Sequence, residues 1–232
     1  MPPTTILSEP RVWDGLQKVA VFDLDRTLIR YDTYRHFLLY CLLRRPSRLL
    51  RAARLLLDVL RFRLRFKDNA WLKMRSLTSV LGGAGESELR LLVGGFVDRT
   101  LARGMRPGAS AALERHRTEG DRLILLSASP DIYATEIAAR LGFAQCLCTL
   151  CERDILGRLT GRLAGVNCYG EEKRRRLEDS FGPSRAALRV IAYADHESDL
   201  PLLTCADEAV LVNPSRKTRR SLAGHPMTTV AW

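Results

Sequence analysis

The stretch from residue 21 to 29, V-F-D-L-D-R-T-L-I, places Asp23 and Asp25 where an apolar β-strand runs out into a turn. Residues two apart in an extended chain project to the same side, so the two carboxylates can act together. Bare neighbouring carboxylates repel each other, and a divalent cation bound only by oxygen atoms, typically magnesium, would neutralise them. Either aspartate alone could cap the next helix, but the pair favours chemistry.

Two further polar residues end apolar stretches. Ser127 closes R-L-I-L-L-S, and Asp195 follows V-I-A-Y-A. Ligands of doubly wound parallel sheets lie outside the carboxyl ends of the strands, so we expect these residues to converge there with the two aspartates. Lys173, near the start of an expected helix, would supply a cation. Ser129 lies two residues after Ser127, and either hydroxyl could face the site.

The elements that must position these residues alternate along the chain. Apolar stretches predict strands at 18–24, 122–127, 145–149, 189–194 and 209–212, a small hairpin in R-L-T-G-R-L at 158–163, and helices at 109–118, 131–141, 171–180 and 199–204. Residues 34–103 show helical spacing throughout. This alternation predicts an α/β fold, a doubly wound parallel sheet, with core segments 1–32 and 106–232 and an inserted helical cap at 33–105.

Four motifs occur in a specific order. They are F-D-L-D-R-T-L-I at 22–29, L-I-L-L-S-A-S at 123–129, G-E-E-K at 170–173 and Y-A-D-H-E-S-D-L-P-L-L at 193–203. Together they resemble the haloacid dehalogenase-like hydrolase superfamily, a Rossmann-like fold, and within it the phosphoserine-phosphatase-like branch with a helical cap. The resemblance covers nearly the whole chain. A single D-x-D-x-T motif would be weak support, whereas four ordered motifs at strand ends are specific.

The resemblance implies a role for each matching residue. Asp23 would be the nucleophile that forms an aspartyl-phosphate, and Asp25 the general acid for the leaving alcohol and then the base for water. Ser127 and Lys173 would hold the phosphoryl oxygens. These residue types suit phosphoryl transfer, in which charge develops on the equatorial oxygens.

The resemblance also implies a magnesium site. Asp195, Asp23 and the backbone carbonyl of Asp25 would bind Mg2+, with Asp199 supporting the metal shell; Asp199 could instead cap the helix that it begins. Arg26 stands where glycine is usual and would contact the substrate phosphate or cover the site. His196 also departs from the family pattern, and we interpret it as a loop residue near the site rather than a ligand.

Composition and charge limit the kinds of partner that we expect. The chain has 232 residues, 46% of them apolar, a formal charge of +11 and a pI near 9.8. These values suggest an anionic partner, either a phosphorylated small molecule, an acidic membrane surface or nucleic acid, but no nucleic-acid motif is present and we expect none. Residues 1–10 do not form a signal peptide and no apolar run would span a bilayer, so we expect a cytoplasmic protein. The oligomeric state is not predicted.

The positive charge concentrates in the expected cap. Residues 44–75 hold 11 Lys or Arg and 2 Asp, a net charge of +9. On a helical wheel one side carries Arg44, Arg48, Arg51, Arg54, Arg61 and Arg65, and the other Leu49, Ala53, Leu56, Leu57, Leu60 and Leu64. Such a helix either contacts an anionic membrane or packs by its leucines with its arginines in water. Leu55, Phe62 and Phe66 lie among the arginines, which favours the membrane.

The beginning of this region, Y-D-T-Y-R-H-F-L-L-Y-C-L-L-R-R-P at 31–46, resembles the cap of phosphatidylglycerophosphatase C-type phosphatases. The sequence therefore favours a magnesium-dependent phosphomonoesterase acting on a lipid-linked or amphiphilic phosphate, such as phosphatidylglycerophosphate, ahead of a soluble one such as phosphoserine. A non-catalytic phosphate- or membrane-binding protein is an alternative, although it would not need both Asp23 and Asp25. A phosphotransferase or mutase would use the same aspartyl-phosphate and exclude water.

The six cysteines raise the question of a zinc site, because Cys146, Cys148 and Cys151 are close in sequence. No histidine lies near them or near Cys168 to complete a zinc site. We expect reduced and largely buried thiols.

Overall fold

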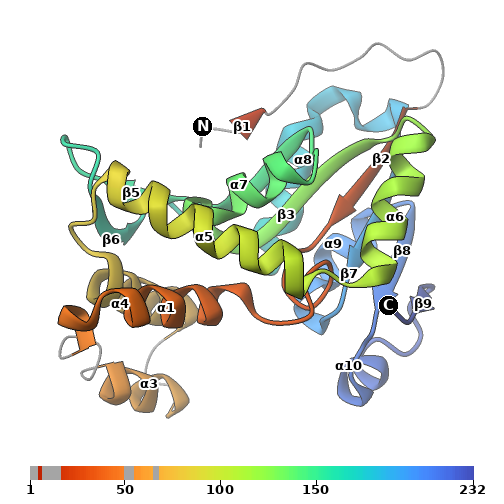
Figure 1. Ribbon diagram of the computed structural model, residues 1–232. Helices are drawn as coiled ribbons and strands as arrows, with labels where there is room; N and C mark the ends of the chain where they lie inside the picture. The colour runs from red at the N-terminus through yellow and green to blue at the C-terminus, as the bar shows by residue number, and fades with distance from the viewer. Residues whose placement is uncertain (1–4, 7–16, 50–54, 65–67) are drawn as a thin grey trace.

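A seven-stranded sheet organises the computed structural model, which describes residues 5–6, 17–49, 55–64 and 68–232 (Figure 1). The strand order is β1-β4-β3-β2-β7-β8-β9. The strands are β1 Thr5–Ile6, β2 Gln17–Phe22, β3 Arg122–Pro130, β4 Gln145–Thr149, β7 Leu188–Ala194, β8 Glu208–Val212 and β9 Thr228–Val230. All neighbours pair in parallel except β1, which runs antiparallel to β4. The predicted α/β fold is confirmed.

The central strand β2 is buried on both faces, as a parallel strand covered by helices should be. Ala20 and Phe22 belong to one apolar core, whereas Val19 and Val21 belong to the other. The first core includes residues of α6 Pro107–Thr118 and α7 Asp131–Arg140, and the second includes residues of α8 Glu171–Phe181 and α9 Leu200–Cys205. Helices therefore cover both faces of the sheet, and β2 delivers its carboxyl end between β3 and β7.

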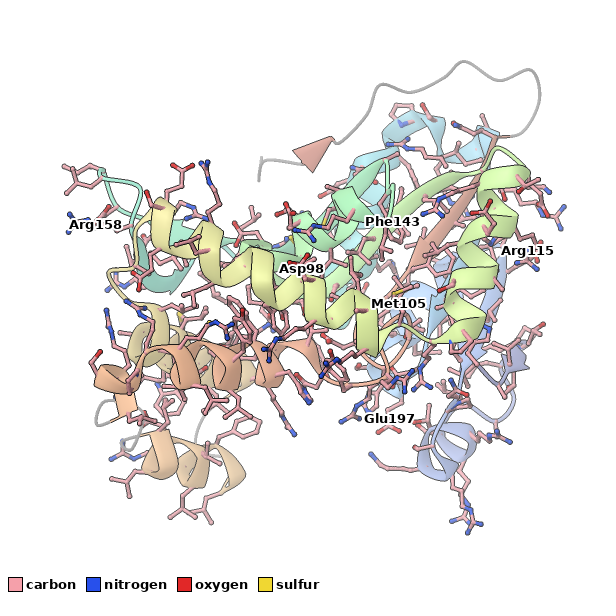
Figure 2. All side chains as sticks on the ribbon, viewed as in Figure 1. Asp98, Met105, Arg115, Phe143, Arg158 and Glu197 are labelled. Atoms are coloured by element: carbon pink, nitrogen blue, oxygen red, sulfur yellow. The ribbon has the colours of Figure 1, made fainter. Side chains whose placement is uncertain are left out.

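The insert after β2 is helical, as predicted. It contains α1 Thr33–Arg44, the short 3-10 helix Pro46–Arg48, α3 Leu55–Arg63, α4 Asn69–Leu81 and α5 Glu86–Gly104. The chain enters and leaves it at one place, where Arg30 N donates to Gly104 O at 2.9 Å and Arg106 N donates to Leu28 O at 3.0 Å. Figure 2 shows Met105 at this junction between the cap helices and the core. The boundaries at 32/33 and 105/106 stay a prediction.

Some expected boundaries were wrong. Strand β3 continues three residues past Ser127 to Pro130, so Ser127 does not end it. The segment R-L-T-G-R-L supplies only one strand of its hairpin, β6 Leu159–Leu163, and the other is β5 Cys151–Arg153. The turn forms earlier because Asp154 Oδ1 accepts from the backbone N–H groups of Leu156 and Arg158. Strand β9 and helix α10 Arg216–Ser221 were not expected.

The β5–β6 hairpin is fastened to the cap. Gly83 N donates to Leu159 O at 2.8 Å, and Leu159 N donates to Ala84 O at 3.0 Å. Gly161 has φ +86°, and a Cβ there would lie 2.5 Å from Thr78 Cα, so only glycine allows this approach. The core segment after β4 therefore packs directly against the cap.

Of the two alternatives for the basic cap segment, packing by its leucines is not what the described side chains of α3 show. Leu57, Leu60 and Leu64 are 61%, 53% and 57% exposed, while the Asp58 side chain is 3% exposed. The wheel residues Arg51, Ala53, Arg54 and Arg65 lie outside the described residues, as do Phe66 and residues 1–4 and 7–10. None of the helices in the described part of the chain is both long and apolar enough to cross a membrane.

All six cysteines are free thiols, and all except Cys205 are buried. Burial raises the pKa of Cys168 and of Cys41 to about 12, which keeps both thiols protonated and unreactive.

Candidate active site

Asp23 lies directly after β2 and is held from several sides. Its backbone N–H donates to Tyr193 O on β7 at 2.9 Å. Its carboxylate accepts from Thr27 Oγ1 at 3.1 Å and from Lys173 Nζ at 2.7 Å, and the residue is 5% exposed. Strand pairing therefore fixes the backbone, and one hydroxyl and one ammonium fix the side chain.

Lys173 joins two of the predicted acidic residues. It lies in the first turn of α8, and Gly170, with φ +59°, immediately precedes this helix. The Nζ atom of Lys173 is 2.7 Å from Asp23 and 2.8 Å from Asp199. Burial alone would lower the pKa of Lys173, but Asp199 and Asp23 outweigh it and the pKa is raised above its usual value. The ammonium therefore stays charged. Asp199 places its carboxylate on Lys173 and does not cap α9, which removes the capping alternative.

Three carboxylates form a cluster that could hold a metal ion. Oxygen atoms of Asp23, Asp195 and Asp199 lie within 4.8 Å of one another. Burial, with a smaller effect from neighbouring carboxylates, raises the pKa of Asp23 to about 8 although Lys173 opposes the shift; burial and then Asp199 raise that of Asp195 to about 7. Buried, mutually repelling oxygen donors suit a hard divalent cation, so the residues present fit magnesium.

Asp25 faces the cap. One carboxylate oxygen accepts from the backbone N–H of Thr33, the first residue of α1, at 2.5 Å, and the other accepts from Ser129 Oγ at 2.8 Å. Burial raises the pKa of Asp25, and the hydrogen bonds from Thr33 and Ser129 oppose this. Helix α1 has its own side-chain cap in Asp32, which accepts from Arg35 N at 3.0 Å. Asp25 is therefore a carboxyl group suited to taking up and releasing a proton at the cap–core boundary.

The two serines after the β3 apolar run are placed differently. Ser127 is fully buried, and its Oγ accepts from Ser129 N at 3.1 Å. Ser129 and Ala128 line the cavity, and Tyr133 OH donates to Ser129 Oγ at 2.9 Å. Ser129 is thus the hydroxyl next to Asp25, while the phosphate-binding role of Ser127 stays a prediction.

Arg26 adopts a backbone conformation that explains why glycine is usual there. Its φ is +62°, in the left-handed region that side chains rarely occupy. Its carbonyl accepts from Arg106 Nε at 3.0 Å. The side chain lines the cavity, and its charge opposes the rise in the pKa of Asp195, whose largest cause is burial. A strained non-glycine residue that lines a cavity is a reason to propose a function for its side chain, and the role of Arg26 stays a prediction.

These residues surround one cavity of about 330 Å3. Its lining comprises Asp23, Asp25, Arg26, Asp32, Tyr34, Arg35, Asn69, Lys73, Ala128, Ser129, Tyr169, Lys173, Asp195, His196, Ser198 and Asp199. The structure therefore brings together every predicted site residue except Ser127, which is fully buried and does not line the cavity. Sequence reasoning missed the contribution of the cap.

Lys73 on α4 is the most buried of the missed cap residues. Its Nζ donates to Ala128 O and to Asn167 Oδ1, both at 2.6 Å, and these are neutral oxygens. Across residues 17–49, 55–64 and 68–232, no carboxylate oxygen forms an ion pair with this ammonium. Burial lowers its pKa to about 8, against the attraction of Asp25. A lysine in register with buried Leu77 and Val80 was the available sequence signal.

A larger hollow, of about 630 Å3, lies between α6 and strands β7 to β9. Four of its charged groups form two ion pairs, Lys18 with Glu119 and Arg189 with Glu208, and Arg115 donates to Tyr193 OH at 2.7 Å. Its buried His116 pairs with Asp121 and Tyr193. The charged and polar groups named here bond to one another, whereas the smaller cavity gathers the predicted site residues and is the candidate active site.

The carboxylate cluster predicts a pH-dependent stability without metal. A carboxyl group with a pKa of 3.8 unfolded and about 8 folded holds its proton more tightly in the folded chain. Its stabilising contribution is complete below the unfolded value and is lost as pH rises through the folded value. We expect the Tm in chelator to fall from about pH 5 to about pH 8, and Mg2+ to raise it more at the higher pH.

Asp195→Asn should make this slope shallower, and Asp98→Asn, an exposed carboxylate on α5, should leave it unchanged. Thermal melts of the three proteins check this. Identical slopes for wild type and Asp195→Asn would contradict a repelling cluster.

Comparisons with known proteins identify relatives of this chain. A family model described as haloacid dehalogenase-like hydrolase matches residues 20–204. Protein CicA of Caulobacter vibrioides is 30% identical over 82% of this chain and 83% of its own length. Phosphoserine phosphatase SerB1 of Mycobacterium tuberculosis is 27% identical over 88% of this chain and 67% of its length.

A crystal structure of a protein of unknown function from Bordetella pertussis superposes with a TM-score of 0.82 at 22% identity, covering 93% of this chain and 99% of that one. This likeness supports the fold. The family match spans the strand β2 aspartates, Lys173 and the Asp195–Asp199 loop. The chain belongs to the haloacid dehalogenase-like hydrolase family.

Proposed function

We propose that this protein is a magnesium-dependent phosphomonoester hydrolase that acts through an aspartyl-phosphate on Asp23. The observation that carries the proposal is the shared environment of Asp23. A buried cation, Lys173, lies at 2.7 Å, two further carboxylates suited to a metal lie within 4.8 Å, and Asp25 lies in the same cavity. The phosphatase named among the relatives supports the same reaction class.

In the first step an oxygen of Asp23 attacks the phosphorus, and the bond from phosphorus to the ester oxygen breaks. Protonated Asp25 gives its proton to the departing alkoxide, which leaves as the alcohol. Lys173 stabilises the charge on the phosphoryl oxygens. When bound to Asp23, Asp195 and Asp199, magnesium would supply further positive charge for these oxygens.

In the second step Asp25, now ionised, takes a proton from a water molecule. The resulting hydroxide attacks phosphorus, the bond to the Asp23 oxygen breaks, and inorganic phosphate leaves. The structure suits both roles, because burial raises the pKa of Asp25 while Thr33 and Ser129 orient its oxygens. The Asp25 carboxyl group can therefore release and take up a proton without changing its side-chain orientation.

We infer that the substrate is a lipid-linked or amphiphilic phosphate, such as phosphatidylglycerophosphate, ahead of a soluble one such as phosphoserine. A cavity of about 330 Å3 with charged walls suits a phosphorylated polar group and cannot accommodate acyl chains as well. Acyl chains would have to remain outside, near a surface that holds them. The exposed leucines of the cap support such a surface. Phosphate release from lipid phosphates, phosphoamino acids and sugar phosphates would rank the candidates.

Asp23→Asn tests the mechanism. A carboxamide cannot act as the nucleophile, so we expect turnover to fall to the limit of detection with the fold retained. Asp25→Asn should slow turnover by about 10²- to 10⁴-fold. Acid quenching with phosphorus-labelled substrate should label wild type and not Asp23→Asn. Wild-type turnover by folded Asp23→Asn would rule the mechanism out.

Lys73→Met tests the cap lysine. The change removes two hydrogen bonds that a charged group donates to Ala128 and Asn167, so kcat/KM should fall roughly 10- to 100-fold. Lys73→Arg should recover part of the loss. Arg90→Met removes an exposed cation of α5 and serves as the matched control, with no expected change. Equal rates for Lys73→Met and wild type would exclude a role in the reaction.

Arg26→Gly separates stability from activity. Glycine adopts the left-handed conformation without strain, so the free energy of unfolding should rise by about 1 kcal/mol. Loss of the cation next to the phosphate entrance should lower kcat/KM. Chemical denaturation and initial rates measure the two effects. An Arg26→Gly protein with unchanged kcat/KM would mean that the side chain only covers the site.

A further inference from the structure

The cap carries an apolar surface that faces away from the rest of the molecule. Leu57, Leu60 and Leu64 lie at spacings of three and four residues, which place them on one side of α3 and its C-terminal turn. All three are more than half exposed. Figure 1 shows α3 as the outermost cap helix, beyond α1 and α4 as seen from α5, and Figure 2 shows side chains projecting outward along it.

The opposite side of α3 is fixed by charge. Asp58 is buried, and its carboxylate pairs with Arg75 Nε on α4 at 3.0 Å and with Arg61 Nη1 at 3.3 Å. Leu55 packs against the core on the same side. The helix therefore directs a polar anchor inward and leucines outward, the reverse of an ordinary surface helix. Because the Asp58–Arg75 pair sets the rotation, the outward leucines are part of the folded arrangement.

Other parts of the cap also expose leucines. Leu39 and Leu43, one turn apart on α1, are 56% and 74% exposed, and Leu49 after the 3-10 helix is 52% exposed. Arg44 and Arg35 are exposed on α1, and Arg61 borders the outward side of α3. Leucines interspersed with arginines, in a segment of net charge +9, match the composition of a helix lying in a lipid–water interface.

The exposed leucines are close in sequence to residues that line the catalytic cavity. Leu64 precedes Asn69 by five residues, and Asn69 and Lys73 at the start of α4 line the catalytic cavity. Arg35 lines the same cavity from α1, four residues before Leu39. Helix α1, which carries Leu39 and Leu43, and helix α4, which follows α3 in the chain, thus form one wall of the site.

We propose that the outward leucines of the cap, led by Leu57, Leu60 and Leu64, insert into the interface of an anionic lipid bilayer while the surrounding arginines contact its head groups. The charge of the segment selects this occupant, because a leucine surface bordered by a net +9 complements an anionic membrane and opposes a second copy carrying the same charge. Insertion stands apart from the reaction at Asp23 and can be tested without it.

The binding experiment compares vesicles of phosphatidylcholine with and without phosphatidylglycerol. We expect wild type and Asp23→Asn to cosediment equally with the anionic vesicles and weakly with the neutral ones. Leu57→Gln/Leu60→Gln should bind about tenfold more weakly, because two side chains no longer enter the apolar phase. Leu91→Gln replaces a 79% exposed leucine on α5 and is the matched control, with no expected change.

Insertion itself has a separate readout. Tryptophan at position 60, introduced as Leu60→Trp, should be quenched by brominated lipids, whereas Leu91→Trp should not exceed the wild-type background. Binding that depends on salt but not on the leucines would overturn insertion and leave only electrostatic adsorption. Lipid-free self-association abolished by Leu57→Gln/Leu60→Gln would assign the surface to a second copy and overturn the proposal.

Activity distinguishes failure of this inference from failure of the proposed reaction. Leu57→Gln/Leu60→Gln should hydrolyse a small soluble phosphomonoester at the wild-type rate and a vesicle-borne phosphate more slowly. Loss on both substrates would show that the leucines support the cap fold and would overturn the docking role. Inactivity of wild type on every phosphate, with vesicle binding intact, would reject the reaction and keep the surface.

Discussion

The buried contact of Lys173 with Asp23 and Asp199 is the constraint on which the rest of the site depends. It joins helix α8 to the end of β2 and to the loop after β7. Three carboxylates and one ammonium in a space of a few ångströms cannot be left unbalanced, because burying an unpaired charge is costly. The lysine balances part of the negative charge in the folded chain, and the remainder favours a divalent cation.

The sequence predicts the core of this arrangement well. Strand β2 and the aspartates after it follow from an apolar run interrupted by carboxylates, and the order of the motifs places Lys173 and Asp195 correctly. These predictions succeed because the carboxyl ends of neighbouring parallel strands meet at one edge whatever the details of the loops. The exact end of β3 was less predictable, since Ser127 and Ser129 lie two residues apart on the same strand.

The cap was harder to predict for a physical reason. A helical wheel gives the relative positions of Leu57, Leu60 and Asp58 but not which side faces the protein, so the sequence left both orientations of the leucines open. The rotation depends on Arg75, which is distant in sequence. Lys73 was missed in the same way, because its partners Ala128 and Asn167 belong to the core. Tertiary contacts of this kind leave only a weak trace in local sequence patterns.

The hydrogen bond from the first backbone N–H of α1 to Asp25 has a consequence for the proposed second step, the hydrolysis of an aspartyl-phosphate on Asp23. Since Thr33 begins the cap and Asp25 belongs to the core, any displacement of α1 relative to the core would change the geometry of the proposed acid–base group. In the proposed mechanism, the position of α1 would then set which acceptor Asp25 can activate while the phosphoryl group is on Asp23. Under that mechanism, the placement of α1 would influence the partition of the phosphoryl group between water and a second alcohol.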